Sequence, residues 1–265
     1  MTRIVIGQYY PISSPIHRID PRVKILCTLF YVTIIFFITN FIGFGISALF
    51  IAILVKLSQV PPKLLFRSLR PILFILVFSA IINIFLTPGE QIIFSFFFIT
   101  ITWEGILLAT LMAIRLTLVF TGSSILTLTT SPIRLTDGIE ALLKPLKVLK
   151  IPAHDITMMM TIALRFIPAL AEEMDKIIKA QKARGADLDT GNFIKRAKSL
   201  IPILVPLFVS AFKRADELAT AMESKCYRGD INRTKMKVMK ITYLDVIASF
   251  FMIAFGTILV LTRFL

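Results

Sequence analysis

Residues 105–128 read GILLATLMAIRLTLVFTGSSILTL, and this stretch decides the fold class. It holds one charged side chain, Arg115, in 24 positions. A helix needs about 20 mostly apolar residues to cross the hydrocarbon core of a bilayer. The stretch therefore predicts a transmembrane helix.

Four further stretches have the same apolar character. They are Val23–Thr39, Phe41–Leu57, Pro71–Thr87 and a C-terminal run from Thr242 to Thr262. The composition agrees, because 56% of the residues are hydrophobic and 17% are charged, whereas about 25% of a soluble domain is charged. The sequence predicts an all-α polytopic membrane protein with about five transmembrane helices.

Local signals mark the ends of some of these spans. Asp20 followed by Pro21 is typical of a helix start, because aspartate caps the first turn and proline fits it. Residues Ile92–Trp103 alternate apolar side chains with serine and threonine, and they are too short to span a membrane. This segment favours an extended hairpin or an interfacial piece.

Lysine and arginine orient the chain, since they gather on the cytoplasmic side of membrane proteins. Residues 131–240 hold 20 of the 30 basic residues, and the N-terminal segment is also basic. The connections Thr39–Phe44 and Pro88–Glu104 contain no lysine or arginine. We expect a multi-pass protein of a bacterial-type cytoplasmic (plasma) membrane, with the N-terminus and residues 131–240 in the cytoplasm and the C-terminus outside.

This pattern divides the chain into an N-terminal membrane domain with four spans (1–130), a cytoplasmic region (131–240) and a C-terminal transmembrane helix (241–265).

A rival topology lets Ile156–Ala171 and Ser199–Phe212 cross the membrane as well. It would place seven basic residues between Glu172 and Lys198 outside, against the positive-inside pattern. Both runs are also shorter than about 20 residues. We interpret them as parts of long cytoplasmic helices.

Three helices are expected in the cytoplasmic region. Ser131–Ile151 is amphipathic and basic, which is typical of a helix in the headgroup layer, and Pro145 should break or kink it. A helix of about thirty residues follows from His154 to Arg184. After a turn at Asp187–Asn192, the third helix runs from about Phe193 to Arg228, bent by Pro202 and Pro206.

The two long helices end in a short repeat, offset by 44 residues. An acidic pair, then ten residues, then Arg-Gly occurs as Glu172-Glu173 before Arg184-Gly185 and as Asp216-Glu217 before Arg228-Gly229. Arginine and glycine are ordinary residues at a helix end. Two matched copies favour a duplicated docking element, because guanidinium can clamp a carboxylate and glycine admits close approach.

No catalytic machinery or cofactor site is predicted. Cys27 and Cys226 lie far apart, and we interpret His17 and His154 as surface or packing residues. The chain has no Gly-x-x-x-x-Gly-Lys-Ser/Thr phosphate loop and no metal-ligand spacing. The net charge of +14 is assigned to a membrane surface and not to nucleic acid.

Several motifs together resemble the transmembrane T component of energy-coupling factor (ECF) transporters. The strongest are Ala183-Arg184-Gly185-Ala186-Asp187 and Tyr227-Arg228-Gly229, which look like paired Ala-Arg-Gly-type motifs. The resemblance spans nearly the whole chain and includes three further stretches: His17-Arg18-Ile19-Asp20-Pro21-Arg22, Ala163-Leu164-Arg165-Phe166-Ile167-Pro168 and Arg214-Ala215-Asp216-Glu217.

The resemblance implies a scaffold with long cytoplasmic coupling helices in an L-shaped arrangement. Such a subunit joins two ABC-type ATPases to a membrane S component that binds a vitamin or a metal ion, and the ATPases hydrolyse the ATP. The residues that would dock the ATPases are Ala183, Arg184, Gly185, Tyr227, Arg228 and Gly229. Tyrosine in place of the usual alanine departs from the family pattern.

Two other functional classes stay open on the residues alone. A self-contained secondary transporter would show broken spans in repeated halves of the membrane region, whereas the repeat here is cytoplasmic. A membrane enzyme acting on a lipid-linked substrate would need paired carboxylates or a metal cluster at the bilayer. Arg115 is either a functional intramembrane charge or a structural donor to carbonyl groups between spans, and we favour the structural role.

Overall fold

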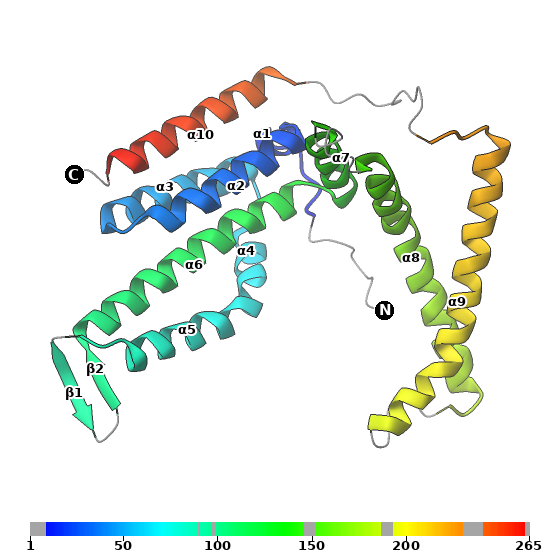
Figure 1. Cartoon of the computed structure of the whole chain (residues 1–265), viewed down its shortest axis with the longest axis horizontal. Helices are drawn as coiled ribbons and strands as arrows, with labels where there is room; N and C mark the ends of the chain where they lie inside the picture. The colour runs from blue at the N-terminus through cyan, green and yellow to red at the C-terminus, as the bar shows by residue number, and fades with distance from the viewer. Residues whose placement is uncertain are drawn as a thin grey trace. The chain divides into compact units, whose positions relative to one another are not determined.

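The computed structural model describes residues 9–89, 91–96, 99–145, 152–186, 193–229 and 241–262. Within these ranges the chain is helical apart from one small β-hairpin (Figure 1). Contacts divide the chain into two compact units. The first, here called the membrane unit, comprises Gly7–Gly138 and Met239–Leu265, and the second, the helical-pair unit, contains Ile139–Val238.

Four stretches of the membrane unit are long and apolar enough to cross a bilayer. They are α3 (Phe41–Ser58), the run Pro62–Leu86 that contains α4 (Pro62–Leu69) and α5 (Leu73–Leu86), α6 (Trp103–Thr129) and α10 (Tyr243–Leu261). The remaining predicted span is α2 (Pro21–Phe37), whose 17 residues stand at the short end of the spanning range. The predicted all-α polytopic membrane fold is confirmed.

Capping explains where α2 begins. The Asp20 carboxylate accepts a hydrogen bond from Arg22 N at 2.9 Å, and Pro21 is the first residue of α2, as predicted. Of the two alternatives predicted for Ile92–Trp103, the structure shows the hairpin, because β1 (Ile92–Phe96) pairs antiparallel with β2 (Ile99–Thr102).

Aromatic side chains form the centre of the membrane unit. The Phe50 and Phe255 rings stack with centroids 4.0 Å apart, and the Tyr31 ring lies 6.0 Å from Phe50. The Tyr31 hydroxyl donates to Leu118 O at 3.2 Å, which links α2 to α6. A side chain at Gly122 would overlap the Tyr31 ring, so glycine allows the two helices to approach closely.

The helical-pair unit is built around α8 (Ala153–Ala183) and α9 (Phe193–Ser224), which run antiparallel. Gln181 at the end of α8 donates to Pro202 O near the start of α9 at 3.3 Å. Glu173 and Arg214 form an ion pair at 2.8 Å farther along the pair. Gln181, late in α8, contacts an earlier residue of α9 than Glu173 does, which establishes the antiparallel direction.

The predicted helix boundaries in this region are partly right. α8 lies within one residue of its predicted start, whereas α9 ends at Ser224 and not at Arg228, so that boundary was wrong. α7 (Pro132–Leu143) begins after Ser131 as predicted and ends two residues before Pro145, as expected because proline disfavours helix at the preceding residue. The turn predicted at Asp187–Asn192 and residues 146–151 lie outside the described residues.

Candidate docking site

The first Arg-Gly motif closes α8 with a Schellman ending. Arg184 is the C-cap residue, and Gly185 follows in the left-handed conformation with φ of +82°. Gly185 N donates to Lys182 O and Ala186 N donates to Gln181 O, each at 3.0 Å. These two bonds satisfy carbonyls that a helix end leaves without partners. The ordinary helix-ending role therefore accounts for Gly185.

The second motif does not occupy the equivalent place. Cys226 N donates to Glu223 O at 2.8 Å and Tyr227 N donates to Met222 O at 3.0 Å, which is the same Schellman pair. Cys226, with φ of +56°, holds the left-handed position that glycine holds in α8. Because α9 ends there, Arg228 lies beyond the helix, and the left-handed Gly229 (φ +72°) is not its cap.

Both arginine tips are open to solvent. Arg184 and Arg228 are exposed, and neither guanidinium forms an ion pair with another residue in the described ranges. A Cβ placed on Gly185 or Gly229 would meet no heavy atom within 4 Å. Each motif thus presents a permanent charge beside unobstructed backbone.

The two motifs lie at opposite ends of the helical pair. Arg184 follows the last turn of α8, whereas Tyr227, next to Arg228, contacts Met158 in the first turns of α8. Met158 and Arg184 are 26 positions apart, which corresponds to about 40 Å at the rise of a straight helix. The two tips are therefore too far apart for one small binding pocket to receive both.

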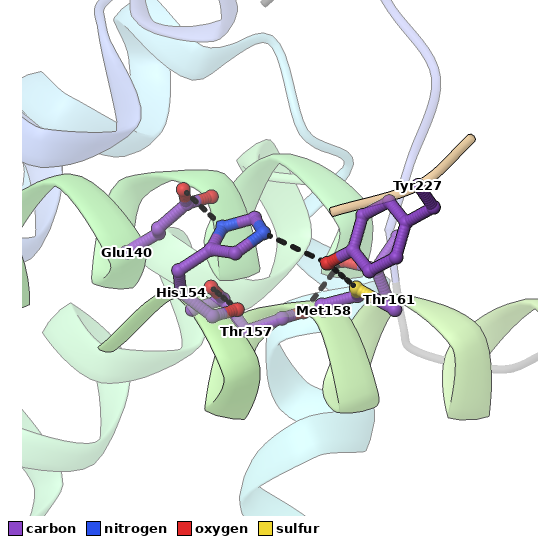
Figure 2. A network of polar contacts seen from close by, with 6 residues as sticks. All are labelled: Glu140, His154, Thr157, Met158, Thr161 and Tyr227. Atoms are coloured by element: carbon purple, nitrogen blue, oxygen red, sulfur yellow. Dashed lines mark hydrogen bonds and ion pairs between the residues drawn. The ribbon is translucent and has the colours of Figure 1, made fainter. Parts of the chain in front are cut away.

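Tyr227 takes part in a polar network with residues of α7 and α8 (Figure 2). Its hydroxyl lies 2.8 Å from Met158 Sδ and 3.4 Å from His154 Nε2. His154 Nδ1 lies 3.5 Å from Glu140 Oε1. Ala183, the equivalent residue of the first motif, has no side-chain group that could make such contacts.

The matched acidic pairs play unequal parts in the structure. Hydrogen bonds from Ser210 and Arg214 lower the pKa of the Glu173 carboxyl, and the Arg214 guanidinium donates to it at 2.8 Å. Glu172, Asp216 and Glu217 are exposed. Thus one of the four carboxylates joins α8 to α9, although the sequence repeat treats them alike.

Arg115 makes its contacts inside the membrane unit. Its Nη2 donates to Ile38 O at 2.6 Å, and its guanidinium carbon lies 5.7 Å from the centroid of the Phe44 ring. Ile38 is the C-cap residue of α2, where carbonyl groups lack helical partners. Arg115 therefore joins α6 to the end of α2, far along the sequence from both Arg-Gly motifs.

The motif His17–Arg22 lies at one end of the membrane unit. Asp20 N donates to Asp245 Oδ1 of α10 at 2.6 Å. Lys24 Nζ, one helical turn farther on, donates to Thr129 O of α6 at 3.0 Å. The motif therefore helps to hold α2, α6 and α10 together, and it lies in a different unit from the Arg-Gly tips.

Sequence reasoning missed Asp245 and the partners of His154. Asp245 forms a capping box with Thr242, and the Thr-x-x-Asp spacing before an apolar run was an available signal. The network of Glu140, His154 and Tyr227 had no comparable signal, since its members are far apart in sequence. No cluster of three or more potential metal ligands occurs among the described side chains.

The two helix endings give a testable contrast in stability. Cys226→Gly should raise the free energy of unfolding by about 1 kcal/mol, because a left-handed backbone costs about that much more in residues other than glycine. Gly185→Ala should lower it by a similar amount. Thermal unfolding in detergent would measure both changes.

Gly45→Ala provides the matched control for the glycine substitution. Gly45 lies inside α3, and an added Cβ would meet no atom within 4 Å, so alanine there should stabilise the helix. A destabilised Cys226→Gly variant would contradict the strain assigned to Cys226.

Comparison with known proteins agrees with this structure. The sequence model of the family described as "Cobalt transport protein", CbiQ, matches residues 12–238. Three similar proteins are each named "Energy-coupling factor transporter transmembrane protein EcfT". The protein from Ruminiclostridium cellulolyticum is 54% identical over 98% of this chain and 97% of its own.

The protein from Thermosediminibacter oceani is 52% identical over 94% of this chain and 93% of its own. The protein from Clostridium kluyveri is 50% identical over 98% and 97%, respectively. Such identity along nearly the whole length confirms the resemblance seen in the motifs. The chain belongs to the EcfT family, the transmembrane components of energy-coupling factor transporters.

Proposed function

We propose that this chain is the coupling and scaffold subunit of an ECF-type ABC importer. It joins two ABC-type ATPases to a membrane S component and transmits ATP-driven movement during uptake of a vitamin or a metal ion. The observation that carries the proposal is the pair of exposed arginine tips at opposite ends of α8 and α9.

The tips have the chemistry that such docking needs. A guanidinium offers several donors in a planar fork and pairs with carboxylates in two parallel hydrogen bonds. The open space around Gly185 and Gly229 lets a partner's backbone come close to each arginine. A separation of about 40 Å along α8 suits one socket on each of two ATPases.

The faces of α8 and α9 suit contact with the S component. Both helices expose large apolar side chains: Met159, Met160, Ile167, Leu200, Ile201, Leu204, Val205, Phe208, Val209 and Phe212. An exposed apolar surface of this kind is typical of a protein or membrane interface. Methionine adapts readily to different neighbours, which favours a surface that follows a moving partner.

The chain contributes coupling, and ATP hydrolysis belongs to its partners. The sequence lacks a nucleotide-binding phosphate loop, and the proposed docking residues are cationic tips rather than an acid–base pair. In this arrangement the N-terminus and residues 131–240 face the cytoplasm of a bacterial-type plasma membrane, where ATP is available, and the C-terminus lies outside.

Co-purification tests the proposal directly. The tagged chain, expressed in a bacterial host together with the ATPase and S subunits, should bring down two ATPase chains and one S component. Proteoliposomes with this chain alone should show no uptake. Purification without any ATPase, together with uptake by the chain alone, would contradict the proposal and support a secondary transporter.

A further inference from the structure

The two docking tips differ in what holds them in place. Arg184 is the C-cap residue of α8, so the helix end fixes its backbone directly. Arg228 follows the last residue of α9, Ser224, by four positions, and a left-handed residue, Cys226, separates it from the helix. The second tip therefore needs a tertiary contact to set its position.

Tyr227 supplies this contact. Its hydroxyl lies 2.8 Å from Met158 Sδ and 3.4 Å from His154 Nε2, so its ring is turned toward the first turns of α8 (Figure 2). Glu140 of α7 approaches the other ring nitrogen of His154 at 3.5 Å. The side chains of His154 and Glu140 are only 14% and 16% exposed, so this last contact is partly buried.

We propose that Tyr227 is a positioning residue, which fixes the second docking tip against α8 and α7 through Met158, His154 and Glu140. This inference rests on the proposed docking function. It makes the two tips unequal, because Ala183 at the equivalent place of the first motif has no hydroxyl. In this role Tyr227 acts on docking through the position of Arg228.

The chemistry of the network explains why tyrosine is needed. A phenol offers one donor and also accepts, and an imidazole joins two partners through its two nitrogens. The side chains thus form a continuous series of polar contacts from the thioether of Met158 through the phenol and imidazole to the carboxylate of Glu140. Phenylalanine would keep the ring and lose the link.

The network also connects the tip to a membrane span by a short path along the chain. Glu140 belongs to α7, which begins at Pro132, three residues after the last residue of α6 at Thr129. A force on Arg228 can therefore reach α7 by two routes. One runs along the backbone of α9, and the other runs through the side chains of Tyr227, His154 and Glu140.

A distance measurement tests the positioning role without any partner. The full chain in lipid nanodiscs would carry one spin label at the native Cys226 and one at Lys179→Cys, both exposed, with Cys27→Ala removing the other thiol. Met158, beside Tyr227, is 21 residues from Lys179, or about 30 Å along α8. Tyr227→Phe should broaden this distance distribution at least twofold, whereas the exposed Tyr243→Phe should leave it unchanged.

Binding measurements then separate positioning from general damage. In a chain with Arg184→Glu, ATPase docking depends on the second tip, so Tyr227→Phe should weaken ATPase affinity by about 5-fold, the size expected for one lost hydrogen bond. In a chain with Arg228→Glu the second tip is already lost, and Tyr227→Phe should change the affinity by less than about 1.5-fold.

Each outcome decides the inference. An unchanged distance distribution, or an equal loss of affinity in both backgrounds, overturns the positioning role. If Arg228→Glu weakens ATPase binding and Tyr227→Phe does not, positioning fails while the proposed function stands. If Arg228→Glu itself has no effect, the docking function fails, and the inference fails with it.

Discussion

Reversing both arginines, as Arg184→Glu together with Arg228→Glu, is expected to release the ATPases and abolish ATP-driven uptake. Each reversal replaces an attraction for acidic partner groups by a repulsion, and losing one charged partner of a buried interface pair costs about 2–5 kcal/mol. Each ATPase, held by one tip, should therefore lose at least about 25-fold in affinity. Membrane insertion should be unchanged, because both side chains are exposed.

Two assays on the same preparation check this expectation. Pull-down of the ATPases and uptake by the reconstituted complex should both fall to background, while the amount of chain in the membrane fraction stays at the level of the unmodified protein. Lys179→Glu with Lys225→Glu is the matched control, since it reverses two exposed charges near the tips. Full ATPase recovery and transport by the double arginine variant would refute the docking role.

Asp245→Ala should be the most destabilising single change in the membrane unit. Asp245 is 1% exposed, and its carboxylate accepts hydrogen bonds from Asp20 N and Thr242 N, both at 2.6 Å. Alanine would leave both backbone donors without a partner and remove the capping box of α10. Each unsatisfied buried donor costs about 1–3 kcal/mol, so a total loss of about 3–5 kcal/mol is expected.

Unfolding in detergent, followed through the tertiary signal of the aromatic core, would measure this loss. Asp245→Asn keeps one acceptor oxygen and should lose roughly half as much stability. Asp216→Ala removes an exposed carboxylate and should change stability by less than about 0.5 kcal/mol. Equal stabilities of Asp245→Ala and Asp216→Ala would contradict the role assigned to Asp245.

Hydropathy predicted the membrane fold well because lipid leaves a chain few choices. Backbone groups in hydrocarbon must be paired within the segment, which favours helices over any long apolar run. Residues 105–128 accordingly lie in one helix, α6. Local capping was equally readable, as Asp20 and Pro21 begin α2 at the predicted place.

The end of α9 was predicted wrongly because the repeat concealed a local difference. Arg228-Gly229 matches Arg184-Gly185 in sequence, yet the left-handed conformation falls on Cys226 in one copy and on Gly185 in the other. Cysteine has no marked preference for that conformation, so nothing in the sequence marked this helix end.

The network around Tyr227 could not be predicted for a different reason. Tyr227 and His154 are separated by 73 positions, and their contact depends on the antiparallel pairing of α8 and α9. Local propensity carries no information about such a pairing. The two Arg-Gly motifs could therefore be found from sequence, whereas the unequal ways in which they are held could not.

The uninterrupted length of α8 between Met158 and Arg184 has a consequence for how this family can vary. Inserting one residue into an α-helix turns everything beyond it by 100° and advances it by about 1.5 Å. A single inserted residue would turn Arg184 away from the site at which we propose it binds an ATPase. An insertion of seven residues, close to two full turns, would keep the direction of Arg184 and lengthen the helix by about 10 Å. Under the proposed docking function, insertions in this helix should therefore be tolerated only near whole numbers of turns, such as about 7, 11 or 18 residues, and only with ATPases whose binding sites are spaced to match.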